Sequence, residues 1–119
     1  MAEGLENCPV RGVIAQIGDK WSVLAILHLG HGGLRFAELR RAMGDDISHR
    51  VLTQVLRKLE REGLVARTVT PAAPPRVDYA LTPLGASLMP HLRALAGWAK
   101  ENRPAIEAAR RRFAGTDPA

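Results

Sequence analysis

This sequence has one cysteine, no long apolar run and no recognisable export signal, and each absence narrows the class of protein. The single Cys8 cannot form a disulfide within the chain, which excludes a disulfide-stabilised secreted scaffold. No apolar run approaches the roughly 18 residues of a membrane span, and residues 1–6 have neither the basic nor the hydrophobic region of a signal peptide. We therefore expect a cytoplasmic protein that does not associate with a membrane.

Residue combinations that support catalysis or metal binding are also missing. Cys8 has no accompanying arrangement of histidine and general acid, and the chain contains no glycine-rich phosphate loop. His28 and His31 are three residues apart, but Gly30 separates them at an expected helix end, and no cysteine or acidic cluster accompanies them. We predict neither an enzyme nor a metal-binding protein, and no cofactor.

Positive charge is present in excess. The 119 residues include 17 Lys and Arg against 12 Asp and Glu, which gives a net charge of +5 and a pI near 10.3. This balance favours a polyanionic partner without naming one, although the abundance of Ala, Gly and Arg together also fits a nucleotide bias of the genome. The length predicts a single domain with one core, over residues 1–114.

The most informative segment predicts a helix over residues 48–62 with two different faces. Apolar residues at helical spacing form one face: Ile47, Val51, Leu52, Val55, Leu56 and Leu59. The opposite face carries His49, Arg50, Thr53, Gln54, Arg57 and Arg61. Ser48 suits an N-cap and Gly63 a helix stop. Cations and amides without an acid until Glu60 are what a DNA recognition helix needs, and a solvated basic surface is the alternative that this helix alone leaves open.

Three shorter helices are expected before this segment. Residues 9–17 predict an amphipathic helix with a proline in its first turn. Asp19 suits the N-cap of a second, almost wholly apolar helix over residues 21–29, the centre of a small core. Residues 35–43 predict a third helix, and a tight turn connects it to Ser48. Two helices joined in this way form a helix-turn-helix.

Two strand-like segments follow the recognition helix and predict a wing over residues 64–82. Residues 64–70 and 77–82 are rich in β-branched or aromatic side chains. Between them the three prolines of residues 71–76 cannot extend a ladder of hydrogen bonds, so we expect a hairpin with a stiff projecting tip that carries Arg76. Tyr79 is expected to pack in the strand.

Residues 84–112 predict a long helix that Pro90 and Pro104 kink or divide. Apolar residues recur on it at heptad-like spacing: Leu84, Leu88, Leu92, Leu95 and Ala99, with Trp98 beside them. One small domain cannot obviously cover so long a stripe, so we predict that a second copy of the chain packs on it. Packing back on the same chain is the alternative. Residues 115–119 are expected to be disordered.

Taken in order, these segments resemble the HxlR-type winged-helix transcription regulators, a branch of the MarR-like group. The resemblance covers about residues 8–98 and lies in Cys8-Pro9-Val10, Ile17-Gly18-Asp19-Lys20-Trp21, Arg35-Phe36-Ala37-Glu38-Leu39-Arg40-Arg41, Ile47-Ser48, Leu52-Thr53, Leu56-Arg57-Lys58-Leu59-Glu60, Gly63-Leu64-Val65-Ala66-Arg67 and Pro74-Pro75-Arg76-Val77-Asp78-Tyr79-Ala80-Leu81-Thr82-Pro83-Leu84-Gly85. The family more often has Gly at the position of Asp19 and Glu at that of Asp78.

The resemblance implies a homodimer on palindromic operator DNA, with the N-terminal helix and the long C-terminal helix in the dimer interface. The interface residues expected here are Val10, Val13, Ile14, Leu88, Leu92, Leu95 and Trp98. Some members sense oxidants, quinones or aldehydes through the cysteine at the position of Cys8, whereas others carry it without such a role. A thiol just before a helix, with Arg11 nearby, favours the reactive thiolate; a small half-buried apolar residue is the alternative.

The predicted fold class is therefore α+β, a mostly helical winged helix-turn-helix domain with a two-stranded wing and a long C-terminal dimerisation helix. The predicted partner is double-stranded DNA, and an unidentified small-molecule effector is compatible with this interpretation. The residues expected to contact DNA are Ser48, His49, Arg50, Thr53, Gln54, Arg57 and, at the minor groove, Arg76; weaker candidates are Arg35, Arg40, Arg41, Lys58 and Arg61. A winged-helix protein-interaction module is the alternative function.

Overall fold

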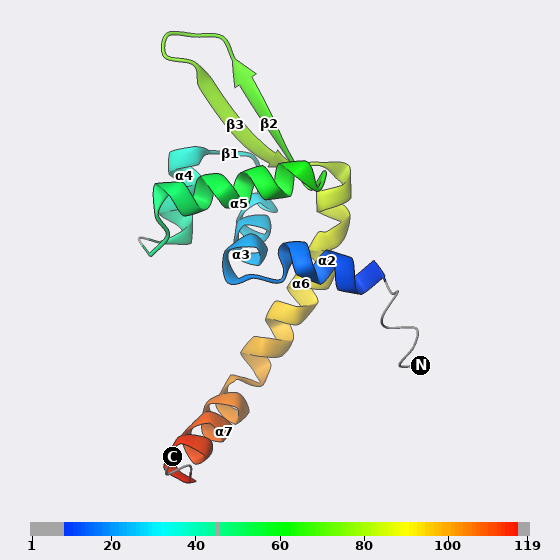
Figure 1. Ribbon diagram of the computed structural model, residues 1–119, viewed down its shortest axis with the longest axis vertical. Coiled ribbons are helices and arrows are strands. Elements are labelled where there is room, and N and C mark those ends of the chain that lie inside the picture. Colours follow the sequence, from blue (N-terminus) through cyan, green and yellow to red (C-terminus); the bar gives the residue numbers. More distant parts are fainter. Residues whose placement is uncertain (1–8, 45, 117–119) are drawn as a thin grey trace. The chain divides into compact units, whose positions relative to one another are not determined.

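The computed structural model of the chain describes residues 9–44 and 46–116, and Cys8 lies outside them. The elements follow in the order α2 (Pro9–Ile17), α3 (Lys20–Leu29), β1 (Leu34–Arg35), α4 (Phe36–Met43), α5 (His49–Arg61), β2 (Val65–Thr70), β3 (Arg76–Leu81), α6 (Pro83–Glu101) and α7 (Arg103–Thr116) (Figure 1). Two compact units divide within α6, one up to Met89 and one from Pro90. The mostly helical winged helix-turn-helix fold is confirmed.

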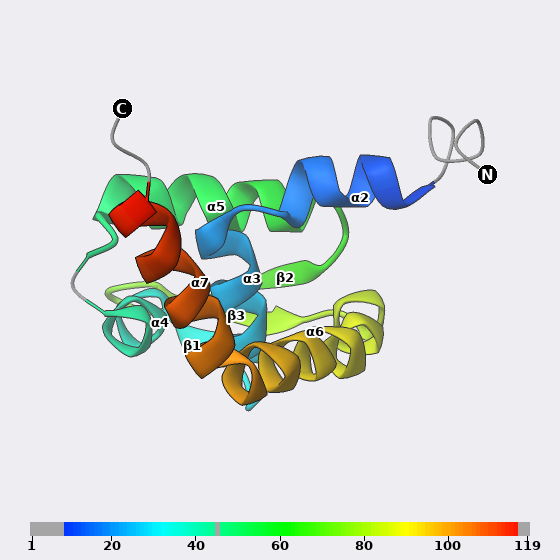
Figure 2. The ribbon, with the colours of Figure 1, turned by 90° about the horizontal axis from the view of Figure 1, so that it is seen from below.

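Helix α3 is the centre of the first unit. It lies beside both α4 and α5 (Figures 1 and 2), because its side chains are apolar on most of its surface. The fully or almost fully buried residues around it are Ala25, Ile26, Leu29, Leu39, Ile47, Leu52, Leu56, Leu59 and Val65. Each large side chain of this kind contributes about 1.5–3 kcal/mol on burial, so the packing of α3 fixes the positions of α4 and α5.

Asp19 is the N-cap of α3, as the sequence predicts, and also connects α3 to α5. Its carboxylate accepts hydrogen bonds from the backbone N–H groups of Trp21 at 3.1 Å and Ser22 at 2.9 Å, and from the buried hydroxyl of Ser22 at 2.7 Å. The ammonium group of Lys58 on α5 lies 2.6 Å from the same carboxylate. One side chain therefore caps α3 and connects it to α5.

The sheet has three antiparallel strands in the order β1-β3-β2, one more than the sequence predicts. The extra strand β1 is only two residues long, too short to show a periodic pattern. Strands β2 and β3 begin and end within one residue of the expected bounds. The expectation that Arg76 lies at the wing tip is wrong: Arg76 keeps a backbone N–H, unlike the prolines before it, and pairs as the first residue of β3 with Thr70.

Two glycines fix where the wing leaves the core. Gly63 ends α5 with a φ of +79°, the left-handed conformation in which a helix stop favours glycine. Gly85, in the first turn of α6, lies so close to the carbonyl of Leu64 that a Cβ would collide with it. The Thr82 hydroxyl completes this corner by donating to the Gly63 carbonyl at 2.6 Å.

The long C-terminal helix of the sequence analysis is two helices. Helix α6 runs through Pro90 and ends at Glu101, and Pro104 lies in the first turn of α7, where a missing N–H costs little. Pro104 thus divides the helix as expected. Helix α7 reaches Thr116, two residues into the segment expected to be disordered, because Gly115 alone costs a helix only about 1 kcal/mol. None of the described helices is long and apolar enough to cross a bilayer.

We expect Asp19→Ala to lower the free energy of unfolding by about 1 kcal/mol, the usual cost of a lost N-cap. Partial burial raises the pKa of Asp19, but hydrogen bonds from Lys58 and Ser22 outweigh it and lower the pKa from 3.8 to about 2. A carboxyl group whose pKa is lower in the folded chain stabilises the fold above pH 3.8, and this contribution disappears as the pH falls toward 2. The Asp19 side chain is 42% exposed, so solvent screens its charge. We therefore expect the pH-dependent contribution of Asp19 to the free energy of unfolding to be smaller than its contribution as an N-cap.

Urea unfolding of the wild type and of Asp19→Asn, from about pH 6 to about pH 2, measures this effect. Asparagine keeps a capping oxygen but loses the charge. An identical pH dependence of stability in the two proteins would show that the Asp19–Lys58 pair contributes nothing.

Candidate nucleic-acid interface

The direction in which α5 presents its polar face is fixed by its cap and its buried face. The Ser48 hydroxyl accepts a hydrogen bond from the backbone N–H of Val51 at 3.1 Å, which confirms the predicted N-cap. Leu52, Leu56 and Leu59 are at most 1% exposed. Because successive residues are rotated by a fixed angle along a helix, burial of these three positions leaves the opposite side of α5 open to solvent.

The turn before α5 is held by an arginine that the sequence analysis placed among the weaker DNA contacts. Arg40 donates from Nε to the carbonyl of Ile47 at 3.0 Å, and Ile47 is itself buried. Arg40, Arg41 and His49 line a hollow of about 250 Å³ between α4 and the start of α5. Arg35 is exposed at the start of α4, where its backbone N–H donates to Glu38 at 2.8 Å.

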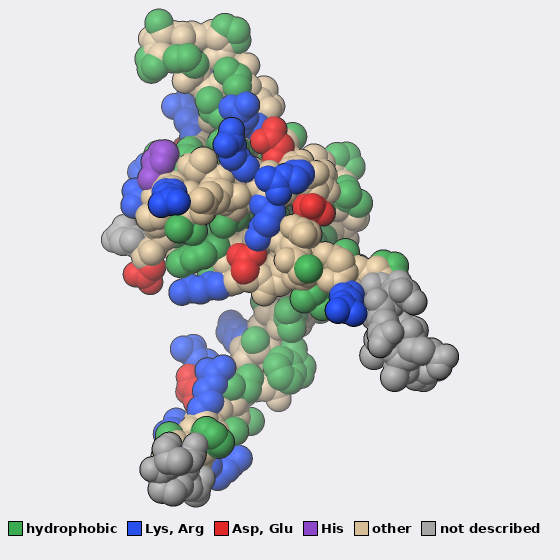
Figure 3. Space-filling view, in the orientation of Figure 1, with side chains coloured by type: hydrophobic (Ala, Val, Ile, Leu, Met, Phe, Trp, Pro, Cys, Tyr) green, Lys and Arg blue, Asp and Glu red, His purple; other side chains and the backbone are tan. Residues whose placement is uncertain are grey.

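The exposed face of α5 carries donors that no other described residue engages. The side chains of Arg50, Gln54 and Arg57 are exposed and form no hydrogen bond or ion pair within the described part of the chain. The His49 ring lies 4.3 Å from that of Phe36 on α4, which restricts its orientation. The space-filling view shows Lys and Arg side chains gathered over α5 and the base of the wing (Figure 3).

The Thr53 hydroxyl is already occupied. It donates to the carbonyl of His49, one turn earlier, at 2.9 Å. Of the two contacts that a threonine offers DNA, hydrogen bonding to phosphate and apolar contact with a thymine methyl, this geometry favours the second.

Two of the predicted cations are paired with acidic side chains, which balance their charge and weaken their attraction for an anion outside the chain. Lys58 is paired with Asp19 and its side chain is only 26% exposed. Arg76 is paired with Asp78 on the same strand, Nε to carboxylate oxygen at 3.0 Å. Arg61, at the end of α5, stays exposed.

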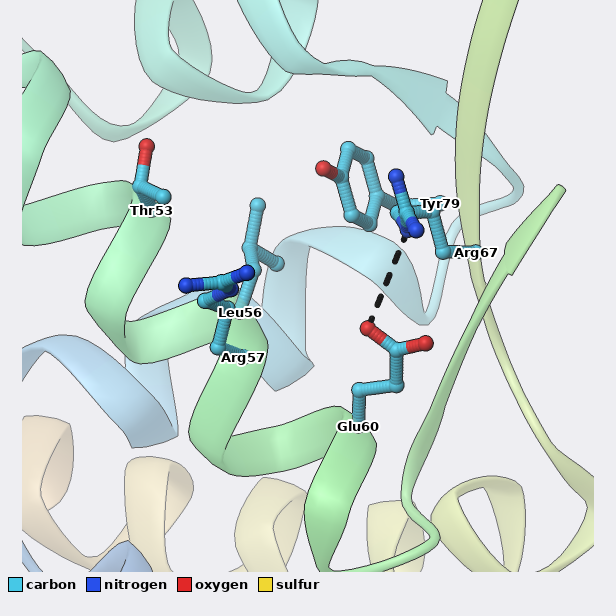
Figure 4. A pocket seen from close by; sticks show the side chains of 6 residues that line it. All are labelled: Thr53, Leu56, Arg57, Glu60, Arg67 and Tyr79. Atoms are coloured by element: carbon cyan, nitrogen blue, oxygen red, sulfur yellow. Dashed lines mark ion pairs between the residues drawn. The ribbon is translucent and has the colours of Figure 1, made fainter. Parts of the chain in front are cut away.

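A pocket of about 430 Å³ lies between α5 and the two wing strands (Figure 4). Its lining residues are Thr53, Leu56, Arg57 and Glu60 from α5, Arg67 from β2 and Tyr79 from β3. Arg67 and Glu60 form an ion pair at 3.9 Å.

From the sequence, Tyr79 is expected to pack in the strand, and Arg67 is not among the predicted site residues. A signal for Arg67 was available in the alternation along β2, since a residue two positions after the buried Val65 lies on the same face of the strand. Within the described part of the chain, no group of three or more His, Cys, Asp and Glu side chains is placed to hold a metal ion.

A model of the HxlR-like helix-turn-helix family matches residues 16–107, which include α3, the sheet, α4, α5 and α6. The chain belongs to this family. Among its relatives, the Escherichia coli K12 protein named uncharacterized HTH-type transcriptional regulator YtfH is 40% identical over 105 residues, which are 88% of this chain and 82% of YtfH.

Solved structures agree with this membership. The redox regulator HypR in its reduced form superimposes with a TM-score of 0.80 at 38% identity, over 84% of this chain and 98% of HypR. The reduced form of the transcriptional regulator YodB from B. subtilis gives a TM-score of 0.70 at 32% identity, over 79% and 92% of the two chains. These relatives of the HxlR-like chain are named as regulators and not as enzymes.

We expect Ser48→Ala to destabilise this HxlR-like domain by about 1 kcal/mol, because the backbone N–H of Val51 loses its acceptor. Ser48→Asn is the matched control, since asparagine caps helices as well as serine does. Urea unfolding of both variants measures the difference, and equal stability of Ser48→Ala and wild type would mean that the cap does not hold the start of α5.

Proposed function

We propose that this HxlR-like protein is a transcriptional regulator that binds a palindromic operator in double-stranded DNA as a homodimer. The observation that carries the proposal is the exposed face of α5, where Arg50, Gln54 and Arg57 have no partner in the described part of the chain. Arginine offers paired donors, and glutamine a donor beside an acceptor, and both patterns match base edges in the major groove. Relatives named as HTH-type transcriptional regulators support the same function.

On this proposal α5 lies in the major groove with its N-terminal half nearest the bases. His49, Arg50 and Gln54 then contact base edges, and Thr53 presents its methyl group to a thymine. The amino end of α5 at Ser48 suits a phosphate, because free N–H groups and the helix dipole favour an anion there. The wing lies at the adjacent minor groove, where Arg76 contributes less than a free arginine because Asp78 balances its charge.

The homodimer is supported by large apolar side chains that are exposed in the single chain. On α2, Val10, Val13 and Ile14 are 54%, 48% and 59% exposed, and on α6 Leu95 and Trp98 are 57% and 56% exposed. Such residues on successive helical turns favour a protein partner.

Two predicted interface residues are less available than the sequence suggested. Leu92 is 8% exposed and Leu88 is half-buried within the single chain. The proposed interface therefore rests on the exposed residues of α2 and on Leu95 and Trp98.

Selecting duplexes from a random pool tests the proposed function. We expect a palindrome with half-sites about 10 base pairs apart or a small multiple of that distance, since two recognition helices then meet the same face of the DNA. Arg50→Ala and Gln54→Ala should each lower the preference for the selected site over unrelated DNA by about tenfold, because each removes a base contact. Arg61→Ala, at the end of the same helix and away from the residues proposed to contact base edges, should leave that preference unchanged.

No enriched sequence, together with weak binding that does not depend on salt, would contradict DNA recognition and favour a winged helix that binds an acidic protein. Enrichment of a single half-site without symmetry would contradict the homodimer.

We also propose that the regulator responds to oxidants or electrophiles through Cys8. The neighbour HypR is named a redox regulator and is known in reduced and oxidised forms, and YodB is known in reduced and diamide-treated forms. This chain has one cysteine, so a thiol response has to act through Cys8, with either a second subunit or a small thiol as the other half of a disulfide.

Treatment with diamide or a quinone should change the affinity of the wild type for the selected duplex and leave Cys8→Ser unaffected, because only a thiolate reacts. Binding titrations before and after treatment measure the effect. The same change in both proteins would remove Cys8 from the response.

A further inference from the structure

The pocket between α5 and the wing brings together positively charged and hydrogen-bond-donating groups from three elements. Arg67 and Tyr79 are directly opposite each other in the β2–β3 register, so their side chains lie on one face of the sheet, the face that carries the buried Val65. Tyr79 points its hydroxyl from β3 toward α5, where Thr53 and Arg57 line the helix side (Figure 4).

The donors of this pocket are incompletely used within the chain. The Tyr79 hydroxyl and the Arg57 guanidinium have no hydrogen-bond partner among the described residues. Arg67 has one partner, Glu60, at 3.9 Å, which is long for a charge-assisted hydrogen bond. The two arginines outnumber the single acid, so the pocket keeps a net positive charge.

These properties suit a phosphate oxygen more than an uncharged ligand. Guanidinium groups bind phosphate through paired N–H donors, and the phenolic O–H adds a third donor from another direction. The buried Leu56 adds an apolar side chain to the lining of the pocket.

The position of the pocket identifies which phosphate it faces, and this step rests on the proposed DNA binding. When a recognition helix occupies the major groove and the wing occupies the adjacent minor groove, one sugar-phosphate strand separates the two grooves. That strand has to pass between α5 and the wing, and the pocket lies between those two elements.

We infer that the pocket binds a backbone phosphate of duplex DNA, with Arg57 and Arg67 as its cations and the Tyr79 hydroxyl as an additional donor. Arg57, which the sequence places among the DNA contacts, then binds the DNA backbone and not a base edge. Arg67 and Tyr79 become DNA contacts that the sequence did not identify. Phosphate contacts fix the register of the protein on the duplex without distinguishing its sequence.

Titrations at several salt concentrations test this inference on the selected duplex and on an unrelated duplex. Arg57→Ala and Arg67→Ala should each weaken binding about tenfold on both DNAs and reduce the slope of log affinity against log salt by about one, as expected for one lost phosphate contact. Tyr79→Phe should weaken binding about threefold without changing the slope, because it removes a neutral donor.

Glu60→Gln is the matched control, since it removes the Glu60–Arg67 ion pair and keeps both cations. We expect it to bind both duplexes at least as tightly as the wild type. A loss equal to that of Arg67→Ala would mean that the ion pair supports the structure, and would overturn the inference. Unfolding curves check that each variant is folded.

A second measurement locates the phosphate. Single phosphates of the selected duplex can be replaced by uncharged methylphosphonates. We expect wild-type binding to weaken when the replaced phosphate is the one at the groove boundary, at one position in each half-site. Binding of the double variant Arg57→Ala/Arg67→Ala should not change on replacement at that position. Equal sensitivity of both proteins at every position would overturn the inference. The two proposals can fail separately. If Gln54→Ala lowers the sequence preference while Arg57→Ala and Arg67→Ala keep the affinity and the salt dependence of the wild type, only the phosphate site is wrong. If the wild type enriches no duplex, both the proposed function and the phosphate site are wrong.

Discussion

The packing of α5 against α3 is the constraint on which the remaining structure depends. Leu52, Leu56 and Leu59 are buried on one side of α5, and the fixed rotation per residue then determines where every other side chain of that helix points. A one-residue shift of the apolar positions would rotate the polar face by about 100°. The Asp19–Lys58 ion pair also connects α5 to the N-terminus of α3.

Positive charge alone does not show which side chains are available to an external anion. Lys58, Arg40 and Arg76 carry the same charge as their neighbours, yet each has an internal acceptor. For Lys58 the acceptor lies 39 residues away in the sequence, and no local pattern shows such a pairing. The internal acceptors of Lys58, Arg40 and Arg76 occupy part of their donor capacity, whereas Arg50 and Arg57 have none among the described residues and stay available to an external anion.

Features that depend on neighbouring residues were predictable from the sequence. The caps at Asp19 and Ser48 and the stop at Gly63 fixed helix ends to within a residue or two, because each acts over a single turn. Features that depend on distant partners were not. Strand β1 exists only because it pairs with β3, and the role of Arg67 depends on a wing strand lying beside α5. The division at Pro104 was predictable because a proline acts on its own helix.

The arrangement separates affinity from sequence preference along one helix. On the proposed docking, the first two turns of α5 face base edges, whereas Arg57 and Glu60 in the third lie beside the wing and the pocket. Contacts to phosphate do not depend on base identity, so substitutions near Arg50 and Gln54 change which site is preferred while Arg57 and Arg67 set how tightly any duplex is held. The net charge of the pocket affects how tightly any duplex is held and does not affect which sequence is preferred. On this docking Glu60, which partly balances Arg67 at 3.9 Å, limits how tightly any duplex is held. The limit is the same for the selected site and for unrelated DNA, so the ratio of the two affinities, which is the specificity, does not depend on it.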